Sequence, residues 1–204
     1  RRVLMIDLDP QGNTTSGLGM EVDDKSIYEV IMGRMKLADV MEETEFKNLS
    51  IAGSDVRLAN AELELVEVEK REYRLKTAVQ SVQQDFDFIF IDCPPSLGLL
   101  TINALGAADS VLIPIQCEYY ALEGVASLMN TISRVKKTIN PHLEIEGILL
   151  TMLDGRTNLG LQVVDEVKKH FKKQVYATVI PRSVRLGEAP SHGCLLYTSP
   201  SPRD

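Results

Sequence analysis

Short apolar runs alternate along the chain with longer segments in which apolar residues recur at helical spacing. Six runs predict β-strands: Val3–Ile6, Leu49–Ala52, Phe88–Ile91, Val111–Ile113, Ile148–Leu150 and Val175–Ile180. A run that is apolar almost throughout, rather than at every second position, is typical of a parallel strand covered by helices on both faces. These runs therefore indicate buried parallel strands.

Helical patterns occupy the intervals between these strands. Apolar residues recur every three or four positions in the segments 58–84, 122–135 and 161–171, and this spacing predicts helices. Asn140-Pro141 predicts the end of the second of them. Two further short helices are expected within 23–47. Strand and helix in alternation predict a doubly wound α/β domain with a mostly parallel sheet.

Composition narrows the class of protein. The chain has 204 residues, of which 44% are hydrophobic and 25% charged, which is ordinary for one globular core. No stretch approaches the roughly 18 apolar residues of a transmembrane helix, and no secretory signal opens the chain. Three scattered cysteines favour a reducing cytoplasm. With no Trp and 5% aromatic residues, a stacking platform for single-stranded nucleic acid is disfavoured.

Carboxylates follow two of the predicted strands. Asp7 and Asp9 follow the first run, and Asp92, with Pro94-Pro95 shortly after it, ends the third. Ligands of open α/β sheets bind beyond the carboxyl ends of the strands, and Mg²⁺ takes one or two carboxylates together with phosphate oxygens and waters. The three carboxylates therefore predict a phosphate and Mg²⁺ site. The alternative for either motif alone is an Asp that caps a helix or loop.

Two stretches also resemble a known family. Residues 2–13 resemble the second signature of the ParA/Soj family of deviant-Walker ATPases, and residues 88–98 resemble its Walker B segment. Three further stretches are similar to that family rather than to nucleotide-binding folds at large: 114–124, 150–158 and 180–193. The resemblance covers residues 1 to about 193, with a Ser/Pro-rich tail at 194–204 that is expected to be disordered or foreign to the domain.

This resemblance implies a P-loop NTPase-like fold, with ATP and Mg²⁺ as cofactors. It implies that Asp9 positions the attacking water, that Asp7 lies on the magnesium side and that Asp92 is the Walker B carboxylate. It also places three residues in base-recognition loops: Thr151, Asp154 and Pro181. Residues 118–124 fall near the surface that closes on a second subunit.

Partners follow from the same resemblance. Members of the family form a homodimer around ATP, and the dimer binds double-stranded DNA without sequence preference. A ParB-type centromere-binding protein then stimulates hydrolysis. A cytoplasmic, nucleoid-associated chromosome or plasmid partitioning ATPase without stable membrane insertion is therefore expected.

The chain departs from the family pattern at both ends. No G-x-x-x-x-G-K-[ST] run occurs in it, and about 30 residues that form a strand, a phosphate loop and a helix are expected ahead of Arg1. Without those amides and lysines a triphosphate lacks its cradle. The chain as given is therefore expected to be inactive, unlike its full-length parent. The Ser/Pro tail is expected to replace the family's closing helix.

A basic segment bears on DNA binding. Although the formal net charge is −7, the stretch 167–186 has no acid and carries six basic residues: Lys168, Lys169, Lys172, Lys173, Arg182 and Arg185. Lys and Arg contacts to phosphate are blind to sequence. From charge alone, a solvated helix face explains the lysines better. The resemblance favours DNA contact for Arg156, Arg182 and Arg185.

Two other functions stay open at this point. A MinD-like ATPase that positions the division machinery on the membrane is the nearest, and it requires a C-terminal amphipathic helix. A catalytically silent α/β binding module is the other.

Cys93 follows Asp92 and has no His near it in sequence, so a structural role is favoured over that of a nucleophile.

Overall fold

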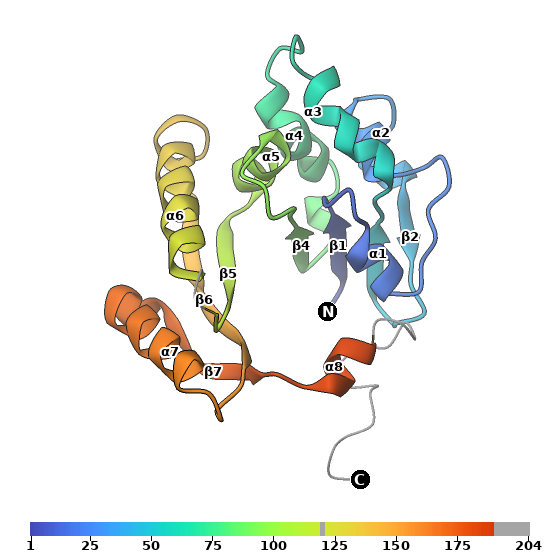
Figure 1. The fold of residues 1–204 in the computed structure, drawn as a ribbon. Coiled ribbons are helices and arrows are strands. Elements are labelled where there is room, and N and C mark those ends of the chain that lie inside the picture. The colour runs from blue at the N-terminus through green and yellow to red at the C-terminus, as the bar shows by residue number, and fades with distance from the viewer. Residues whose placement is uncertain (119–120, 190–204) are drawn as a thin grey trace. The chain divides into compact units, whose positions relative to one another are not determined.

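The chain divides into two compact units, each with its own β-sheet (Figure 1). The computed structural model describes residues 1–118 and 121–189, with the backbone alone at 121–123. Unit 1 comprises residues 1–108 and the described residues from 188 onward, and unit 2 comprises 109–187. The expected tail at 194–204 lies outside the described residues.

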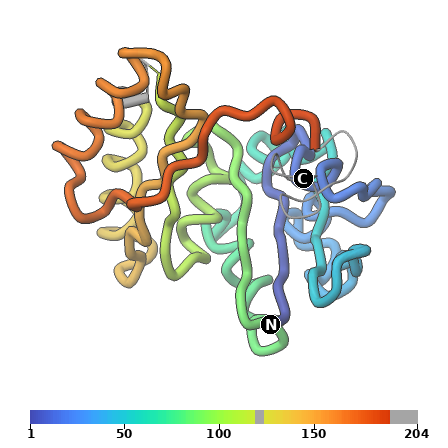
Figure 2. The backbone as a smooth tube through the Cα atoms, turned by 90° about the horizontal axis from the view of Figure 1, so that it is seen from below, coloured from blue at the N-terminus to red at the C-terminus, as the bar shows by residue number. Residues whose placement is uncertain are grey.

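Unit 1 is built on a four-stranded sheet in the order β2-β3-β1-β4. Its strands are β1 (Val3–Asp7), β2 (Met41–Glu43), β3 (Leu49–Ala52) and β4 (Phe88–Asp92). β1 pairs in parallel with both β3 and β4, and β2 pairs antiparallel with β3. β1 and β4 also begin together, because Asp87 N donates to Arg2 O at 2.8 Å (Figure 2). The carboxyl ends of β1 and β4 therefore lie at one edge of the sheet.

Short helices surround this sheet. The α-helices are α1 (Asn13–Gly17), α2 (Ile27–Ile31), α3 (Ala61–Glu64), α4 (Arg74–Gln80) and α5 (Leu99–Ala107). The 3-10 helices are η1 (Leu37–Asp39), η2 (Val56–Asn60), η3 (Arg71–Tyr73) and η4 (Gln83–Asp85). Leu4 and Ile6 of β1 are fully buried in one apolar cluster with Ile31, Leu58 and Leu75. Burial of each such side chain contributes about 1.5–3 kcal/mol.

Unit 2 is built on a three-stranded parallel sheet in the order β5-β6-β7. Its strands are β5 (Ser110–Gln116), β6 (Glu144–Leu153) and β7 (Val175–Pro181). Its helices are α6 (Ala121–Thr138), α7 (Asn158–Phe171) and η5 (Lys172–Gln174), and α8 (Val184–Glu188) follows β7. The Thr157 hydroxyl caps α7 by accepting from Gly160 N at 3.3 Å. Leu153 and Pro181 are in register, so β6 and β7 end side by side.

The predicted α/β class with parallel strands is confirmed, and all six predicted strands are present. Helices also occupy 122–135 and 161–171, within α6 and α7. Two short helices, α2 and η1, lie within 23–47, where the sequence did not predict β2. The segment 58–84 forms several short helices, and Lys70 adopts a left-handed φ of 53° where the chain turns between α3 and η3.

The seven strands form two separate sheets. β4 and β5 are edge strands, and each has one side that is not paired with any described strand. Phe88 and Phe90 of β4 are 43% and 50% exposed, and their rings stack with centroids 6.3 Å apart. The continuous apolar run of β4 predicted cover on both faces, whereas these two phenylalanines are open to solvent. Within the described part of the chain, no helix is both long and apolar enough to cross a membrane.

Candidate functional site at the strand ends

Asp7 ends β1 and is completely buried. Its Oδ1 accepts from Asp9 N at 3.2 Å, and its Oδ2 accepts from the backbone N and the hydroxyl of Thr15, at 2.9 and 2.7 Å. Burial raises the pKa of Asp7; these hydrogen bonds lower it in part, and the nearby Asp92 carboxylate raises it again. Both oxygens of Asp7 therefore hold the loop that follows β1 and the helix α1.

Asp9 is held in a tight turn after β1. Its Oδ1 accepts from Gln11 N at 3.0 Å, and its backbone O accepts from Gly12 N at 3.0 Å. Gly12 has a φ of +64°, which favours glycine, and it precedes the first residue of α1. The turn fixes one carboxylate oxygen of Asp9 and leaves Oδ2 without a hydrogen bond from the described residues.

Asp92 ends β4 directly beside Asp7, because the two residues are paired in register. Its backbone O accepts from Leu8 N at 2.8 Å, and its Oδ2 accepts from the Thr14 hydroxyl at 2.6 Å. Cys93, the next residue, lies close to the negative charge of the Asp92 carboxylate. Burial, then Asp92 and Asp9, raise the pKa of the Cys93 thiol to about 12. The structure thus brings Asp7, Asp9 and Asp92 to one edge of the unit 1 sheet, and Cys93 is protonated at neutral pH.

Thr14 and Thr15 bond to the strand-end carboxylates, and the sequence analysis did not predict these contacts. Thr15 is 4% exposed, and its hydroxyl donates to Asp7 and accepts from Ser54 N at 3.0 Å. The neighbouring Thr14 hydroxyl reaches Asp92. Together the two hydroxyls connect α1 to the ends of β3, β1 and β4. The one sequence signal was their place immediately after the Gly12 turn, where side-chain hydroxyls often bond to nearby groups.

The carboxylate oxygens at this edge are better suited to bind Mg²⁺ through its waters than to coordinate the ion directly. No three His, Cys, Asp or Glu side chains are grouped as ligands of a metal anywhere in residues 1–118 or the described part of 121–189. Magnesium usually keeps several waters and takes one or two carboxylates. The Thr14 O–H donates to Asp92 as an ion-bound water would, so Asp92 fits that role. The sequence contains no Gly-rich phosphate loop that could bind the phosphate groups of ATP.

The three residues expected in base-recognition loops belong to unit 2. Thr151 lies inside β6, where its hydroxyl donates to Ile115 O at 3.2 Å. Asp154 follows β6, and Pro181 ends β7 in register with Leu153. Asp154 and Pro181 are therefore close neighbours at one edge of this sheet, whereas Thr151 is held within the strand.

The three candidate DNA-binding arginines follow the ends of β6 and β7. The Arg156 guanidinium makes two hydrogen bonds to Asp154, at 2.9 and 2.8 Å, and Arg156 N makes a third at 3.1 Å; these bonds hold the pKa of that carboxyl well below its usual range. Arg182 N donates to Leu153 O at 2.9 Å, and its guanidinium lies 3.9 Å from Glu118. Arg185 lies in α8. Arg156 and Arg182 therefore share one edge, with acidic residues beside them.

The lysines of the basic segment lie elsewhere in unit 2. Lys168 and Lys169 are in the last turn of α7, and Lys172 and Lys173 are in η5 at the start of β7. The seven residues of β7 separate this end from Arg182, a span of about 23 Å at ~3.3 Å per residue. What the sequence presents as one basic segment is therefore two groups at opposite ends of a strand.

Comparisons with known proteins identify the family of the chain. Residues 1–145 match a family model described as an AAA domain. The chain is 57% identical over 195 residues to the sporulation initiation inhibitor protein Soj of Bacillus subtilis (strain 168), with 95% of this chain and 77% of Soj covered. It is 52% identical over 195 residues to the chromosome partitioning protein ParA of Myxococcus xanthus (strain DK1622), with 95% and 69% covered.

A solved structure is also similar. It is cobyrinic acid a,c-diamide synthase from Mycobacterium smegmatis with bound ATP analog and magnesium. That chain is 38% identical, the TM-score is 0.84, and the match covers 95% of this chain and 80% of the other.

Proposed function

This chain belongs to the ParA/Soj family of chromosome-partitioning ATPases, and we propose that it acts in partitioning through Mg²⁺-ATP. The observation that supports this most directly is the meeting of Asp7, Asp9 and Asp92 at one sheet edge, with Asp7 and Asp92 in register. The similar structure that contains an ATP analog and magnesium carries the name of an amide synthase. Its 38% identity is well below the 57% shared with Soj, which favours partitioning.

The three carboxylates then have different tasks. Mg²⁺ supplies positive charge that offsets the phosphates when the nucleotide is bound. Asp92 would hold a water of the hydrated ion with the oxygen that accepts the Thr14 hydroxyl in this structure. Asp9, fixed by the Gln11 amide, orients the attacking water with its other oxygen. Asp7 would lie on the side of the magnesium ion, and its bond from Asp9 N holds the backbone of Asp9 in place.

A phosphate loop is the part of the machinery that these 204 residues do not contain. We therefore expect the polypeptide by itself to show no saturable binding of a fluorescent ATP analogue below about 1 mM, the upper end of ordinary KM values. A chimera extended at its amino terminus by a family phosphate loop should bind the analogue and hydrolyse ATP. In that chimera Asp9→Asn should abolish hydrolysis and retain binding. Hydrolysis at the family's rate by the unextended chain would contradict the need for that loop, and hydrolysis by the Asp9→Asn chimera would contradict the task given to Asp9.

DNA binding is assigned to the edge where β6 and β7 end. Arg156, Arg182 and Arg185 would contact phosphates of double-stranded DNA, and Thr151, Asp154 and Pro181 would lie toward the adenine of ATP. Dimerisation around ATP, stimulation by a ParB-type centromere-binding protein and a cytoplasmic, nucleoid-associated location complete the proposal. Family membership supports each of these statements as a proposal.

The salt dependence of DNA affinity tests the arginine assignment. In the ATP-bound chimera, Arg182→Ala should lower the slope of log affinity against log salt by about 0.9, the value for one lost phosphate contact. Lys173→Ala is a matched control, because it removes one positive charge at the opposite end of β7. An unchanged slope for Arg182→Ala, or an equal drop for Lys173→Ala, would remove Arg182 from the interface. Co-sedimentation of the chimera with liposomes would instead favour the MinD-like alternative.

A further inference from the structure

The helix α5 begins without a capping group of its own. Its N-cap residue is Gly98, which has no side chain that could accept a hydrogen bond, and its first turn contains no acidic residue. The first four amides of a helix have no partner within it, and a Ser, Thr, Asp or Asn at the N-cap usually satisfies one of them. The first turn of α5 therefore depends on an acceptor from elsewhere in the chain.

Glu62, in α3, supplies that acceptor. Its Oε1 accepts from Leu100 N at 3.3 Å, although 38 positions separate the two residues. Gly98 leaves the space that the carboxylate occupies, because a Cβ atom at position 98 would lie less than 3.0 Å from the carboxyl carbon and from both of its oxygens. A negative charge at the N-terminus of a helix also interacts favourably with the helix dipole. Glu62 thus gives α5 the cap that its own sequence lacks.

The first turn of α5 is also the fixed end of the loop that follows Asp92. Residues 93–98 connect the end of β4 to α5, and the Thr101 hydroxyl donates to Ser96 O at 2.6 Å. Leu100 and Thr101 are 3% and 5% exposed. Whatever orients this turn therefore also limits the positions that the loop after Asp92 can adopt.

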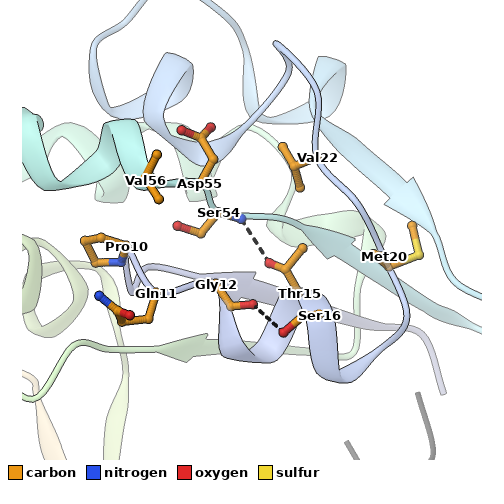
Figure 3. Close-up of a pocket in the computed structure, with 10 residues that line it drawn as sticks. All are labelled: Pro10, Gln11, Gly12, Thr15, Ser16, Met20, Val22, Ser54, Asp55 and Val56. Carbon is orange, nitrogen blue, oxygen red and sulfur yellow. Dashed lines mark hydrogen bonds between the residues drawn. The ribbon is translucent and has the colours of Figure 1, made fainter. Parts of the chain in front are cut away.

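The segment that carries Glu62 begins at the other half of the strand-end site. Ser54 N donates to Thr15 Oγ1 at 3.0 Å (Figure 3), and η2 and α3 follow directly. Two residues beyond Glu62, both oxygens of Glu64 accept from the Tyr28 hydroxyl, at 2.9 and 3.0 Å. Contacts other than that of Glu62 therefore hold α3 in place, and they present the Glu62 carboxylate to α5 from a fixed support.

We propose that Glu62 positions the loop after Asp92 by capping α5 from α3. The importance of this contact for hydrolysis rests on the proposed function, in which Asp92 would hold a water of hydrated Mg²⁺. The segment from Ser54 to Glu62 then joins the two halves of the strand-end site. Its start is bonded to the threonine that holds Asp7, and its end is bonded to the helix that follows Asp92. A movement of α3 would therefore reach both carboxylates.

Amide hydrogen exchange of the 204-residue chain, resolved by residue, tests the cap without nucleotide. Glu62→Ala should speed exchange at Leu100 and Ile102 about three- to ten-fold, the usual effect of a lost cap, and leave the amides of β1 unchanged. Glu62→Gln keeps an oxygen acceptor of the same reach and should change exchange by less than about two-fold. Glu67→Ala, the matched control, removes an exposed glutamate from the turn after α3. Equal acceleration in Glu62→Gln or Glu67→Ala, or acceleration throughout β1, would overturn the proposal.

The loop itself is read through Cys93, because Pro94 and Pro95 have no amide proton. Iodoacetamide should alkylate Cys93 about three- to ten-fold faster in Glu62→Ala than in the unsubstituted chain, in proportion to the lost cap. The rate in Glu67→Ala should stay at that of the unsubstituted chain. An unchanged rate in Glu62→Ala would show that the cap does not position the loop.

The close approach to Gly98 offers a second variant that leaves Glu62 in the sequence. Gly98 has a φ of −83°, which alanine adopts without strain. The methyl group of Gly98→Ala should therefore displace the carboxylate and accelerate exchange at the same amides. Because both changes remove one contact, the double variant should exchange no more than about two-fold faster than either single variant. Additive effects would refute the placement of the carboxylate against Gly98.

The consequence for hydrolysis is measured in the chimera that carries a phosphate loop. Glu62→Ala should lower kcat at least about five-fold, since a small displacement near the reacting groups slows a reaction steeply. The affinity for the fluorescent ATP analogue should stay within about two-fold. An unchanged kcat would remove Glu62 from a positioning role. A chimera that fails to hydrolyse ATP even without this substitution would contradict the proposed function instead, and exchange in the 204-residue chain would still decide whether Glu62 caps α5.

Discussion

The Thr15 hydroxyl offers the sharpest test of the strand-end geometry. Thr15→Val keeps the shape of the side chain but removes the donor to Asp7 Oδ2 at 2.7 Å and the acceptor of Ser54 N at 3.0 Å. A hydrogen bond to a charged group is worth about 1.5–3 kcal/mol, and an unsatisfied buried N–H costs about 1–3 kcal/mol. We therefore expect Thr15→Val to lower the free energy of unfolding of unit 1 by about 3–5 kcal/mol.

The loss should also depend on pH. The pKa of Asp7 is already raised in the folded protein, mainly by burial, and removal of a donor raises it further. A raised carboxyl pKa favours the folded state below the unfolded pKa and loses that contribution as pH rises through the folded pKa. The deficit of Thr15→Val should therefore be larger at pH 7 than in acid below the raised pKa of Asp7, where this carboxyl is protonated.

Native-state amide hydrogen exchange read by mass spectrometry is the appropriate assay, because peptides from β1 and β3 report on unit 1 alone. Thr15→Ser keeps the hydroxyl and loses one methyl, so it should cost about 1 kcal/mol. Ser16→Ala removes an exposed hydroxyl from the same helix, one that bonds only to backbone O atoms of Gly12 and Asn13, and it should cost little. The reasoning is refuted if Thr15→Val lies within about 1 kcal/mol of Thr15→Ser.

Two further outcomes are expected. Asn103→Leu should destabilise unit 1 by about 2–4 kcal/mol, because the fully buried amide accepts from Leu75 N and donates to two backbone oxygens. Hydrogen exchange in α4 and α5 measures this loss of stability. A loss equal to that caused by Asn60→Leu, at an exposed position, would contradict the prediction. Cys93, with a pKa of about 12 against 9.0 for a free thiol, should hold about 500-fold less thiolate at pH 9 than in the unfolded chain. Its alkylation by iodoacetamide should slow accordingly, and equal rates with and without urea would show that the thiol is not buried as described.

Much of the fold was predictable because burial on both faces leaves a continuous apolar run. β1 is the clearest example, with Leu4, Ile6 and Asp7 buried, and parallel pairing follows from the alternation of strands with helices. The proximity of Asp7 to Asp92 is predictable for the same reason, since neighbouring parallel strands end at a common edge of the sheet. These are the parts of the site that depend on strand position alone.

Other elements left no periodic signal. α5 reads Leu-Leu-Thr-Ile-Asn-Ala-Leu-Gly-Ala, and most of it is buried, so it lacks the polar face that marks a surface helix. β2 has three residues, two of them glutamates, and it is a strand only because it pairs with β3. Such elements are fixed by contacts with distant residues, which local propensity does not encode.

The same argument explains why the sequence pointed to carboxylates and not to the hydroxyls that hold them. Thr15 meets Ser54 across 39 positions, and Thr14 meets Asp92 across 78. Successive residues of an α-helix point about 100° apart, so two adjacent threonines at the start of α1 reach two different strands. Because one hydroxyl is bonded to Asp92 while the other joins Asp7 to Ser54, α1 is held against three strand ends at once. The turn that carries Asp9 leads directly into this helix, so the position of Asp9 is set jointly by β3, β1 and β4 rather than by the loop alone.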